Sequence, residues 1–392
     1  MRNFILFSSI YVCVFSGYYL TTSFLNILYP EYAFWSFVTF YGVYALGSIF
    51  SVLVVHKLNL KVTLFLSCLT FCIFVGFAGS NILAMLMVGS FVGGLGNSVI
   101  WLVQGTFLES NEMGNFYMLF NINIIFGNLF GLIVLLSGLS PQIMILSMTG
   151  ICFAGVILSF FVKEKEKSVE SEEVKKNESG EEKREKEENV LKKLLNIFKG
   201  TKDVYFLIPS YVYQAIGLNV TYQIIPRVMW STCLETEKMK NIYNAIIFLV
   251  YGVFAMGFSW LWGKLLVGKE KDAQACRNWK FVVIPYSILE VLTLLTIFIL
   301  GKYNTECGYW IIVGACRGII DYGINNTINI TLSEKFPEKI TSHFSLFRFI
   351  YAISYLITSI LIGYIPYPYI LLTCLISLLS STTFYSLFQK YN

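Results

Sequence analysis

Long apolar runs alternate with short polar breaks along almost the whole chain. A helix that crosses the hydrocarbon core of a membrane needs about 20 mainly apolar residues, which is close to the length of each run. Twelve runs are therefore predicted as transmembrane helices, namely residues 4–28, 33–56, 61–80, 82–108, 115–138, 141–162, 203–225, 241–266, 280–301, 307–332, 341–364 and 367–388. The predicted fold class is an all-α membrane protein with twelve transmembrane helices in two six-helix halves.

A repeated heptapeptide connects the two halves. Tyr41–Gly47 reads YGVYALG and Tyr251–Gly257 reads YGVFAMG, with two conservative changes. Each copy falls in the second predicted span of its half, and equivalent elements in two halves are typical of transporters built from parallel repeats. Glycine-rich apolar heptads also coincide by chance in membrane sequences, but the matching positions favour duplication.

One segment interrupts the apolar pattern between the halves. Residues 163–202 contain 12 Lys or Arg and 11 Glu, with almost no large apolar residue before Leu191. A stretch that buries so little apolar surface does not offset the entropy lost on ordering. We therefore expect an N-terminal half over residues 1–162, a charged cytosolic linker over 163–202 and a C-terminal half over 203–392. A regulatory role for the linker is the alternative to a flexible tether.

Composition and charge support a membrane protein. The chain is 56% hydrophobic with a mean hydropathy of +0.65, whereas soluble domains are about 45–50% apolar. With the N-terminus in the cytosol, 23 basic residues fall on the cytosolic side and four on the other, or 11 against four without the linker. This asymmetry follows the positive-inside rule and predicts an integral, multi-pass protein with both termini cytosolic. The net charge of +5 is explained by the basic residues in the loops on the cytosolic side of the membrane, so no nucleic-acid partner is expected.

Few residues suit catalysis or metal binding. The only histidines are His56 and His343, and the sequence has no nucleophile elbow, phosphate loop or metal-binding signature. We expect no enzymatic activity, no cofactor and no metal site. Cys233 and Cys307 both fall on the predicted non-cytosolic side, where oxidation is permitted, and a disulfide between them is a hypothesis.

Polar side chains inside the fourth and fifth spans form the first candidate site. Asn97, Trp101 and Gln104 lie at i, i+4 and i+7 on one helical face, and Asn121 and Asn128 are seven apart. An unpaired amide is costly in lipid, so these faces should look into the bundle or a wet cavity. The neighbouring glycines, which allow close helix packing, are Gly94, Gly96, Gly127 and Gly131. For each amide taken alone, a role in joining helices is the simpler interpretation.

The tenth and eleventh spans carry the most costly residues. Arg317 and Asp321 are four apart and should pair along the helix, while Asn325 continues the polar stripe. Arg348 lies in the eleventh span without an assigned partner, and Glu290 of the ninth span is placed near a membrane interface. An ionisable residue at a helix centre costs about 2.5–3.5 kcal/mol, so these charges require compensation inside the protein. A structural ion-pair network, a conformational gate and an ion or substrate site remain the three interpretations.

A wider motif carries a family resemblance. In the first half it consists of Gly94, Gly96, Trp101, Gln104, Gly105, Phe107, Leu108 and Phe126–Asn128. In the second half it consists of Phe198, Gly200–Lys202, Tyr213, Gly217, Gly318, Asp321, Asn325, Phe336, Pro337, Phe344 and Phe347–Phe349. This pattern resembles the Unc-ninety-three-like family, the ion-channel regulatory protein branch of the major facilitator superfamily. It departs at Asn219, where members tend to carry Glu, and at Tyr351 and Ala352.

The resemblance implies a major facilitator architecture with a central cavity facing both halves. It implies transporter-like handling of a small solute or ion, or, alternatively, a non-transporting regulatory or trafficking partner of another membrane protein such as an ion channel. The loop over residues 56–61 lacks the acidic residue that the superfamily's gating loop usually carries, which weighs against transport. The expected partners are the lipid bilayer and either that solute or a membrane-protein partner.

Overall fold

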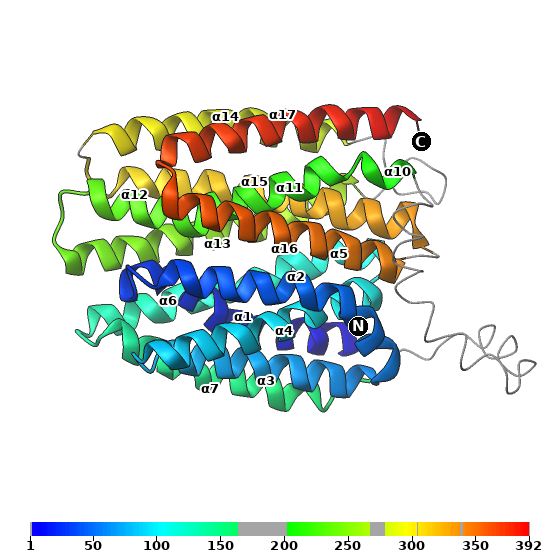
Figure 1. Ribbon diagram of the computed structural model, residues 1–392, viewed down its shortest axis with the longest axis horizontal. Coiled ribbons are helices and arrows are strands. Elements are labelled where there is room, and N and C mark those ends of the chain that lie inside the picture. Colours follow the sequence, from blue (N-terminus) through cyan, green and yellow to red (C-terminus); the bar gives the residue numbers. More distant parts are fainter. Residues whose placement is uncertain (1, 164–201, 267–278, 304, 338–339, 392) are drawn as a thin grey trace, which may run out of the picture.

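The protein is a bundle of long helices, described by a computed structural model for residues 2–163, 202–266, 279–303, 305–337 and 340–391 (Figure 1). The first half contains α1 (Arg2–Leu28), α2 (Ala33–Lys57), α3 (Leu60–Ala78), α4 (Leu83–Phe107), α5 (Ser110–Phe120), α6 (Ile122–Leu136) and α7 (Pro141–Ser159). The second half contains α10 (Lys202–Tyr205), α11 (Ile208–Asn219), the π-helical turn η1 (Val220–Ile224), α12 (Ile225–Thr232), α13 (Glu237–Leu266), α14 (Lys280–Lys302), α15 (Tyr309–Lys335), α16 (Ile340–Tyr364) and α17 (Tyr367–Tyr391).

Two of the spans are built from more than one helix. The helices α5 and α6 meet at Asn121, and α11, η1 and α12 follow one another without a gap. Counted in this way, the described residues form six spans in each half, which confirms the predicted fold class. The predicted linker lies outside the described residues except at Lys163 and Lys202.

Ten spans of the described chain are long and apolar enough to cross a membrane by length and composition alone. The other two are α15, whose interior carries charged and amide side chains, and the span from α11 to α12. The predicted seventh span ended at residue 225, but helical structure continues to Thr232. Pro226 does not stop the helix, because it falls in the first turn of α12, where its missing N–H group is not needed.

The two halves pack in corresponding ways. Helix α2 packs against α4 as α13 packs against α15, and across the halves α2 packs against α16 while α13 packs against α5 and α6. The two heptapeptides lie on α2 and α13. Any Cβ at Gly94 would clash with the Phe40 carbonyl oxygen, and one at Gly318 would clash with the Tyr251 carbonyl oxygen. The repeat therefore marks equivalent helix crossings. A glycine of the fourth span lies on the backbone of the second, and a glycine of the tenth span lies on the backbone of the eighth.

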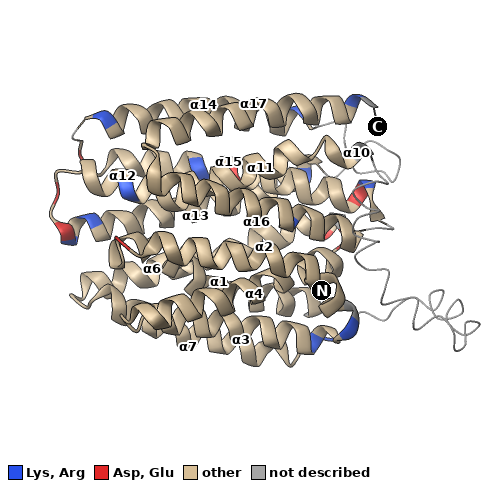
Figure 2. Ribbon diagram, viewed as in Figure 1, with Lys and Arg blue, Asp and Glu red and all other residues tan. Residues whose placement is uncertain are grey.

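Charged residues gather at the two ends of the bundle (Figure 2). Both chain ends lie at one end, here called the terminal end (Figure 1). Large apolar side chains such as Leu46, Ile133 and Ile312 are exposed along the helices between the two ends. An apolar outer surface of this kind suits lipid, so the chain is an integral, multi-pass membrane protein.

Candidate functional site

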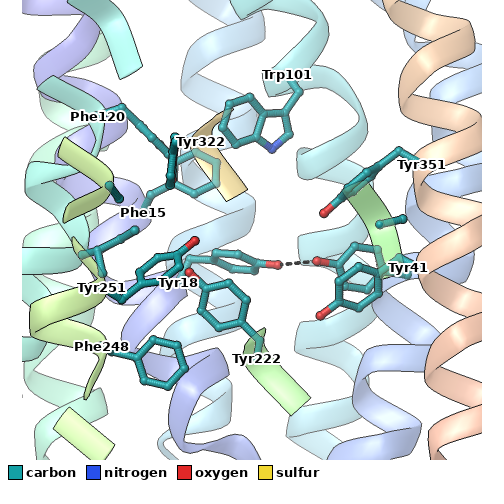
Figure 3. Packing of buried hydrophobic residues seen from close by; sticks show 14 of the residues in the cluster. Phe15, Tyr18, Tyr41, Trp101, Phe120, Tyr222, Phe248, Tyr251, Tyr322 and Tyr351 are labelled. Carbon is teal, nitrogen blue, oxygen red and sulfur yellow. Dashed lines mark hydrogen bonds between the residues drawn. The ribbon is translucent and has the colours of Figure 1, made fainter. Parts of the chain in front are cut away.

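A small cavity lies between the two halves, in the middle of the bundle. Its volume is about 60 Å³, which is enough for a few water molecules. The side chains around it come from α1, α2, α4, α5, α11, η1, α15 and α16, and most of them are aromatic (Figure 3). The polar members are Thr22, Asn97, Gln214, Asp321, Asn325 and Arg348, besides the tyrosine hydroxyl groups.

Tyrosine rings join the halves beside this cavity. Tyr18 and Tyr41 of the first half share a hydrogen bond of 3.2 Å between their hydroxyl groups (Figure 3). Tyr41 also stacks on Tyr355 of α16, with 3.6 Å between ring centroids. Tyr19 of α1 stacks on Tyr222 of η1 at 5.4 Å. These pairs give the cavity apolar walls with hydroxyl groups at their edges.

Arg317 lies fully buried at the centre of an ionic cluster. It forms salt bridges with Asp321, one turn further along α15, and with Glu290 of α14. Its guanidinium also donates to the Gly217 carbonyl oxygen at 2.7 Å and to the Thr221 hydroxyl at 2.8 Å. One positive and two negative formal charges give this cluster a sum of −1.

Asp321 is the member of the cluster that reaches the cavity. Its Oδ2 accepts hydrogen bonds from the Thr221 hydroxyl at 2.8 Å and from the Tyr251 hydroxyl at 3.2 Å. The predicted contact between Arg317 and Asp321 is present. Glu290, which was expected near a membrane interface, lies midway along α14 and is completely buried against Arg317.

Arg348 lines the same cavity but has a different environment. It is 4% exposed, and its guanidinium lies 4.8 Å from the ring centroid of Trp101 and 4.5 Å from that of Phe347. Its Nη2 donates to Asn329 Oδ1 at 3.5 Å, while the hydroxyl groups of tyrosines from α2 and α5 lie nearby. Among the described residues its Nε has no hydrogen-bond partner, and no carboxylate lies within the 4.0 Å of an ion pair.

Amide side chains hold this part of the site in place. Asn325 Oδ1 accepts from Gln214 Nε2 at 2.8 Å and from Asn329 Nδ2 at 2.9 Å, which links α11 to α15. Asn97 Oδ1 accepts from the indole N–H of Trp101 at 2.9 Å. The second bond fixes the orientation of the Trp101 ring that lies beside Arg348.

The two ends of the bundle differ in how the halves meet. At the end opposite the termini, a larger cavity of about 550 Å³, here called the vestibule, is lined by α1, the following loop, α2, η1, α12 and α16. Gln223 lines the vestibule and Tyr222 lines the central cavity, so η1 separates the two. At the terminal end the halves are in contact, because the Ser345 hydroxyl donates to the Ser48 carbonyl oxygen at 2.8 Å.

Comparisons with known proteins agree with this two-half arrangement. Residues 6–359 match a family model described as Major Facilitator Superfamily. The chain belongs to the major facilitator superfamily. No curated protein sequence matches it.

Two solved structures of the superfamily share its fold. The proton:xylose symporter XylE bound to 6-bromo-6-deoxy-D-glucose matches with a TM-score of 0.65 and 12% identity, over 98% of this chain and 94% of that chain. The E. coli fucose:proton symporter FucP matches with a TM-score of 0.66 and 13% identity, over 100% of this chain and 98% of that chain. At such low identity the likeness concerns the fold alone.

In this major facilitator protein, the predicted site residues separate into two groups. Those that line the central cavity are Asn97, Trp101, Asp321, Asn325 and Arg348. Arg317 stands behind Asp321 and holds it. The remaining three are buried outside the cavity lining and are Gln104, Asn121 and Asn128.

Each amide of this second group bonds to a neighbouring helix or to its own. Gln104 Nε2 contacts the Met113 sulfur at 3.1 Å, so it joins α4 to α5. Asn121 Nδ2 donates to the Ser259 hydroxyl at 2.8 Å, across the contact between the halves. Asn128 Nδ2 donates to a carbonyl oxygen one turn back on its own helix, at 2.8 Å. In this structure, therefore, these amides bond within the helix bundle.

The four predicted packing glycines all lie against a neighbouring helix. Gly94 faces the α2 backbone, and any Cβ at Gly96 would clash with Thr70 of α3. A Cβ at Gly127 would lie 2.7 Å from the Ser16 carbonyl oxygen of α1, and one at Gly131 would lie 2.9 Å from a methionine sulfur of α7. A Cβ at Gly94 or Gly127 would require a shift of the neighbouring backbone, whereas one at Gly96 or Gly131 would first displace neighbouring side chains.

Several contacts of the site were not predicted from the sequence. Three side chains contact a predicted site residue of another span: Glu290 contacts Arg317, Gln214 contacts Asn325 and Thr221 contacts Asp321. Their local sequence does not predict these contacts. The tyrosines had a usable signal, since the two heptapeptides begin with Tyr41 and Tyr251, and both lie at the site. Each repeat therefore supplies a cavity or cluster tyrosine as well as a helix crossing.

Asn219 illustrates a departure from the family pattern. Its Nδ2 donates to the Tyr355 carbonyl oxygen at 3.1 Å, and its Oδ1 accepts from the Ser359 hydroxyl at 3.0 Å. The neutral side chain thus joins α11 to α16 beside the cavity. No carboxylate is present at this position.

A disulfide joins Cys233 and Cys307, with 5.3 Å between their Cα atoms. It connects the end of α12 to the segment just before α15. Beside it, the Leu234 N–H donates to the Thr305 carbonyl oxygen at 3.3 Å. The hypothesis of a pairing between the two cysteines therefore agrees with the structure.

Proposed function

We propose that this protein transports a small solute or ion by alternating access, with the cavity between Asp321 and Arg348 as its central site. The observation that carries the proposal is that a buried acid and a buried base line one cavity between the two halves. Ionisable side chains at the centre of a membrane protein are costly and usually mark substrate or ion pathways. In parallel-repeat transporters the substrate site lies at the interface between the halves, near the middle of the membrane.

The unequal ends of the bundle support the same proposal. The two halves are in contact at the terminal end and enclose a vestibule at the other end. This arrangement corresponds to one of the two states that alternating access requires, the state open at the vestibule end. In this interpretation a solute reaches the vestibule first and passes η1 to reach the central cavity. Rocking of the halves would then open the terminal end.

We also propose the orientation of the chain. The excess of basic residues at the terminal end supports cytosolic termini, and the disulfide at the other end supports an oxidising compartment there. The proposed organisation is a half over residues 1–162, a cytosolic linker over 163–202 and a half over 203–392. The vestibule would then face away from the cytosol.

A second candidate function follows from the residue pattern of the Unc-ninety-three-like branch, to which we propose that the chain belongs. In that case it would regulate or traffic another membrane protein, such as an ion channel, without transport. The neutral Asn219 favours this candidate, because members of that branch tend to carry Glu at this position and its absence weighs against Glu-dependent ion coupling. The two candidates differ in one measurable property, which is flux.

Flux in reconstituted vesicles tests the proposal. Ser48→Cys together with Ser345→Cys places two thiols at a contact between the halves, so oxidation should lock the terminal end closed. We expect saturable uptake from a panel of labelled amino acids, carboxylates, sugars and nucleosides. Uptake by the double variant should stop on oxidation and return on reduction, while the wild type, treated identically, controls for the native disulfide. Uptake that persists in the locked protein, or no uptake of any solute, would contradict the transport proposal.

A further inference from the structure

Two charged side chains line the central cavity, and only one of them is compensated by opposite charge. Asp321 forms a salt bridge with Arg317 and accepts two hydroxyl hydrogen bonds. Arg348 is 96% buried, has no described carboxylate within ion-pair distance, and leaves its Nε without a hydrogen-bond partner. The cavity therefore contains a guanidinium group that forms no ion pair with a described carboxylate.

Neutral neighbours hold Arg348 but do not cancel its charge. The ring faces of Trp101 and Phe347 attract the guanidinium through their electron density. Its bond to Asn329 is at the outer limit of hydrogen-bond length, at 3.5 Å. Because Asn97 fixes the Trp101 ring, the guanidinium is held in place. The hydroxyl groups of Tyr44 and Tyr117 also interact with it, while its Nε has no hydrogen-bond partner among the described residues.

We propose that Arg348 binds a carboxylate group of the transported solute. This inference rests on the proposed transport function and names the class of its substrate. A guanidinium is a planar fork of donors that matches the two oxygens of a carboxylate, and its charge is fixed. The aromatic walls of the cavity then enclose the less polar remainder of a small molecule.

The rest of the charge distribution limits the solute to one carboxylate. The cluster of Arg317, Glu290 and Asp321 has a formal charge of −1, and Asp321 faces the same cavity. A second negative group on the solute would approach this acidic side and be repelled. An ammonium group would not, so the class includes simple monocarboxylates and amino acids.

A purely structural role for Arg348 makes a different prediction. The sum of −1 on the cluster and +1 on Arg348 is zero, so Arg348 could serve only to balance the cluster across the cavity. In that case small carboxylates would have no effect on the protein.

Ligand-induced stabilisation of the full chain in lipid discs separates the two roles. The probes are lactate and lactamide, alanine and alaninamide, and the dicarboxylate succinate. A ligand that binds only the folded state raises the melting temperature progressively with its concentration. We expect lactate or alanine to stabilise the protein, and their amides and succinate to bind at least tenfold more weakly. The ratio of alanine to lactate binding reports whether Asp321 meets an ammonium group.

Variants assign the effect to Arg348. Arg348→Gln should abolish the response to the carboxylate, and Arg348→Lys should keep the charge but weaken binding about tenfold, or about 1.4 kcal/mol, because a lysine lacks the planar fork. Lys302→Gln removes a cation far from the cavity, at the end of α14, and should respond like the wild type. If Arg348→Gln does not fold, Arg348→Lys and the carboxylate–amide contrast of the wild type decide the question.

Two results would overturn the inference: no stabilisation by either carboxylate, or an Arg348→Gln variant that responds like the wild type. Flux of the same probes into vesicles is measured separately. Arg348-dependent carboxylate binding without flux would refute transport and leave the assignment of Arg348 standing. Transport of uncharged solutes that is unchanged in Arg348→Gln would refute the assignment of Arg348 and leave the transport proposal standing.

Discussion

Removal of Arg317 together with Asp321 is the most informative perturbation of the ionic cluster. An isolated pair on one helix would allow both residues to be replaced by apolar ones with little loss, because buried ion pairs are often no more stabilising than apolar packing. The structure predicts a different result, since Arg317 also pairs with Glu290. The double variant Arg317→Met, Asp321→Leu leaves Glu290 fully buried, with the Cys374 thiol at 3.3 Å as its remaining partner.

The magnitudes follow from the number of charges left without a partner. Loss of one partner of a buried pair costs about 3–5 kcal/mol, so the double variant, which leaves only Glu290 without its partner, should be destabilised by this amount. Arg317→Met leaves both Glu290 and Asp321 without it and should be destabilised by at least as much. Glu290→Gln alone leaves Arg317 bound to Asp321 and the Gly217 carbonyl, and should cost about 1.5–3 kcal/mol, the range for a hydrogen bond to a charged group. The triple variant Glu290→Leu, Arg317→Met, Asp321→Leu removes every charge of the cluster and should recover most of the loss.

Unfolding of the purified variants in detergent, by heat and by titration with sodium dodecyl sulfate, measures this order. Size-exclusion profiles before unfolding show how much of each variant is folded. A double variant as stable as the wild type would show that Arg317 does not compensate Glu290. A triple variant less stable than the double would show that the cost lies in packing and not in charge.

Two further predictions concern packing and orientation. Gly94→Leu should lower stability in detergent by about 1–3 kcal/mol, the usual cost of overpacking. The matched change Gly150→Leu should be tolerated, because an added Cβ at Gly150 meets no atom within 4 Å. Equal melting temperatures for the two would contradict the predicted helix crossing. A protease site inserted at Gly180 should be cut only from the cytosolic side, and one inserted at Glu235 only from the opposite side. Cleavage of both from one side would contradict the proposed orientation.

Sequence patterns predicted the fold well because a membrane imposes one rule on every span. Apolar runs located the spans, although α15 and the α11–α12 span do not reach the length and hydropathy of the other ten described spans. The repeat of Tyr41–Gly47 placed α2 and α13 in equivalent positions. Boundaries were less predictable where a local cause competes with hydropathy. The predicted seventh span ended at residue 225, just before Pro226, but a proline in the first turn of a helix is compatible with its start.

Only those contacts of the site that lie within a single helix could be predicted from the sequence. The spacing of Arg317 and Asp321 predicted a contact because both lie on one helix, and the face shared by Asn97 and Trp101 proved to be bonded. Contacts between helices depend on rotation about each helix axis, which hydropathy does not encode. For this reason the partner role of Glu290 was missed, and Gln104 could not be distinguished in advance from residues that line the cavity.

The disulfide restricts how the α11–α12 span and α15 can move relative to each other. These two spans are fastened at two points, by Arg317 to Gly217 and Thr221 near the middle and by Cys233 to Cys307 at one end. Because the two spans are joined at two points, they can move together, but one cannot slide along the other or separate from it. If the halves rock as proposed, any tilt of η1 that widens the vestibule carries α15 with it, and Asp321 then changes its position at the central cavity.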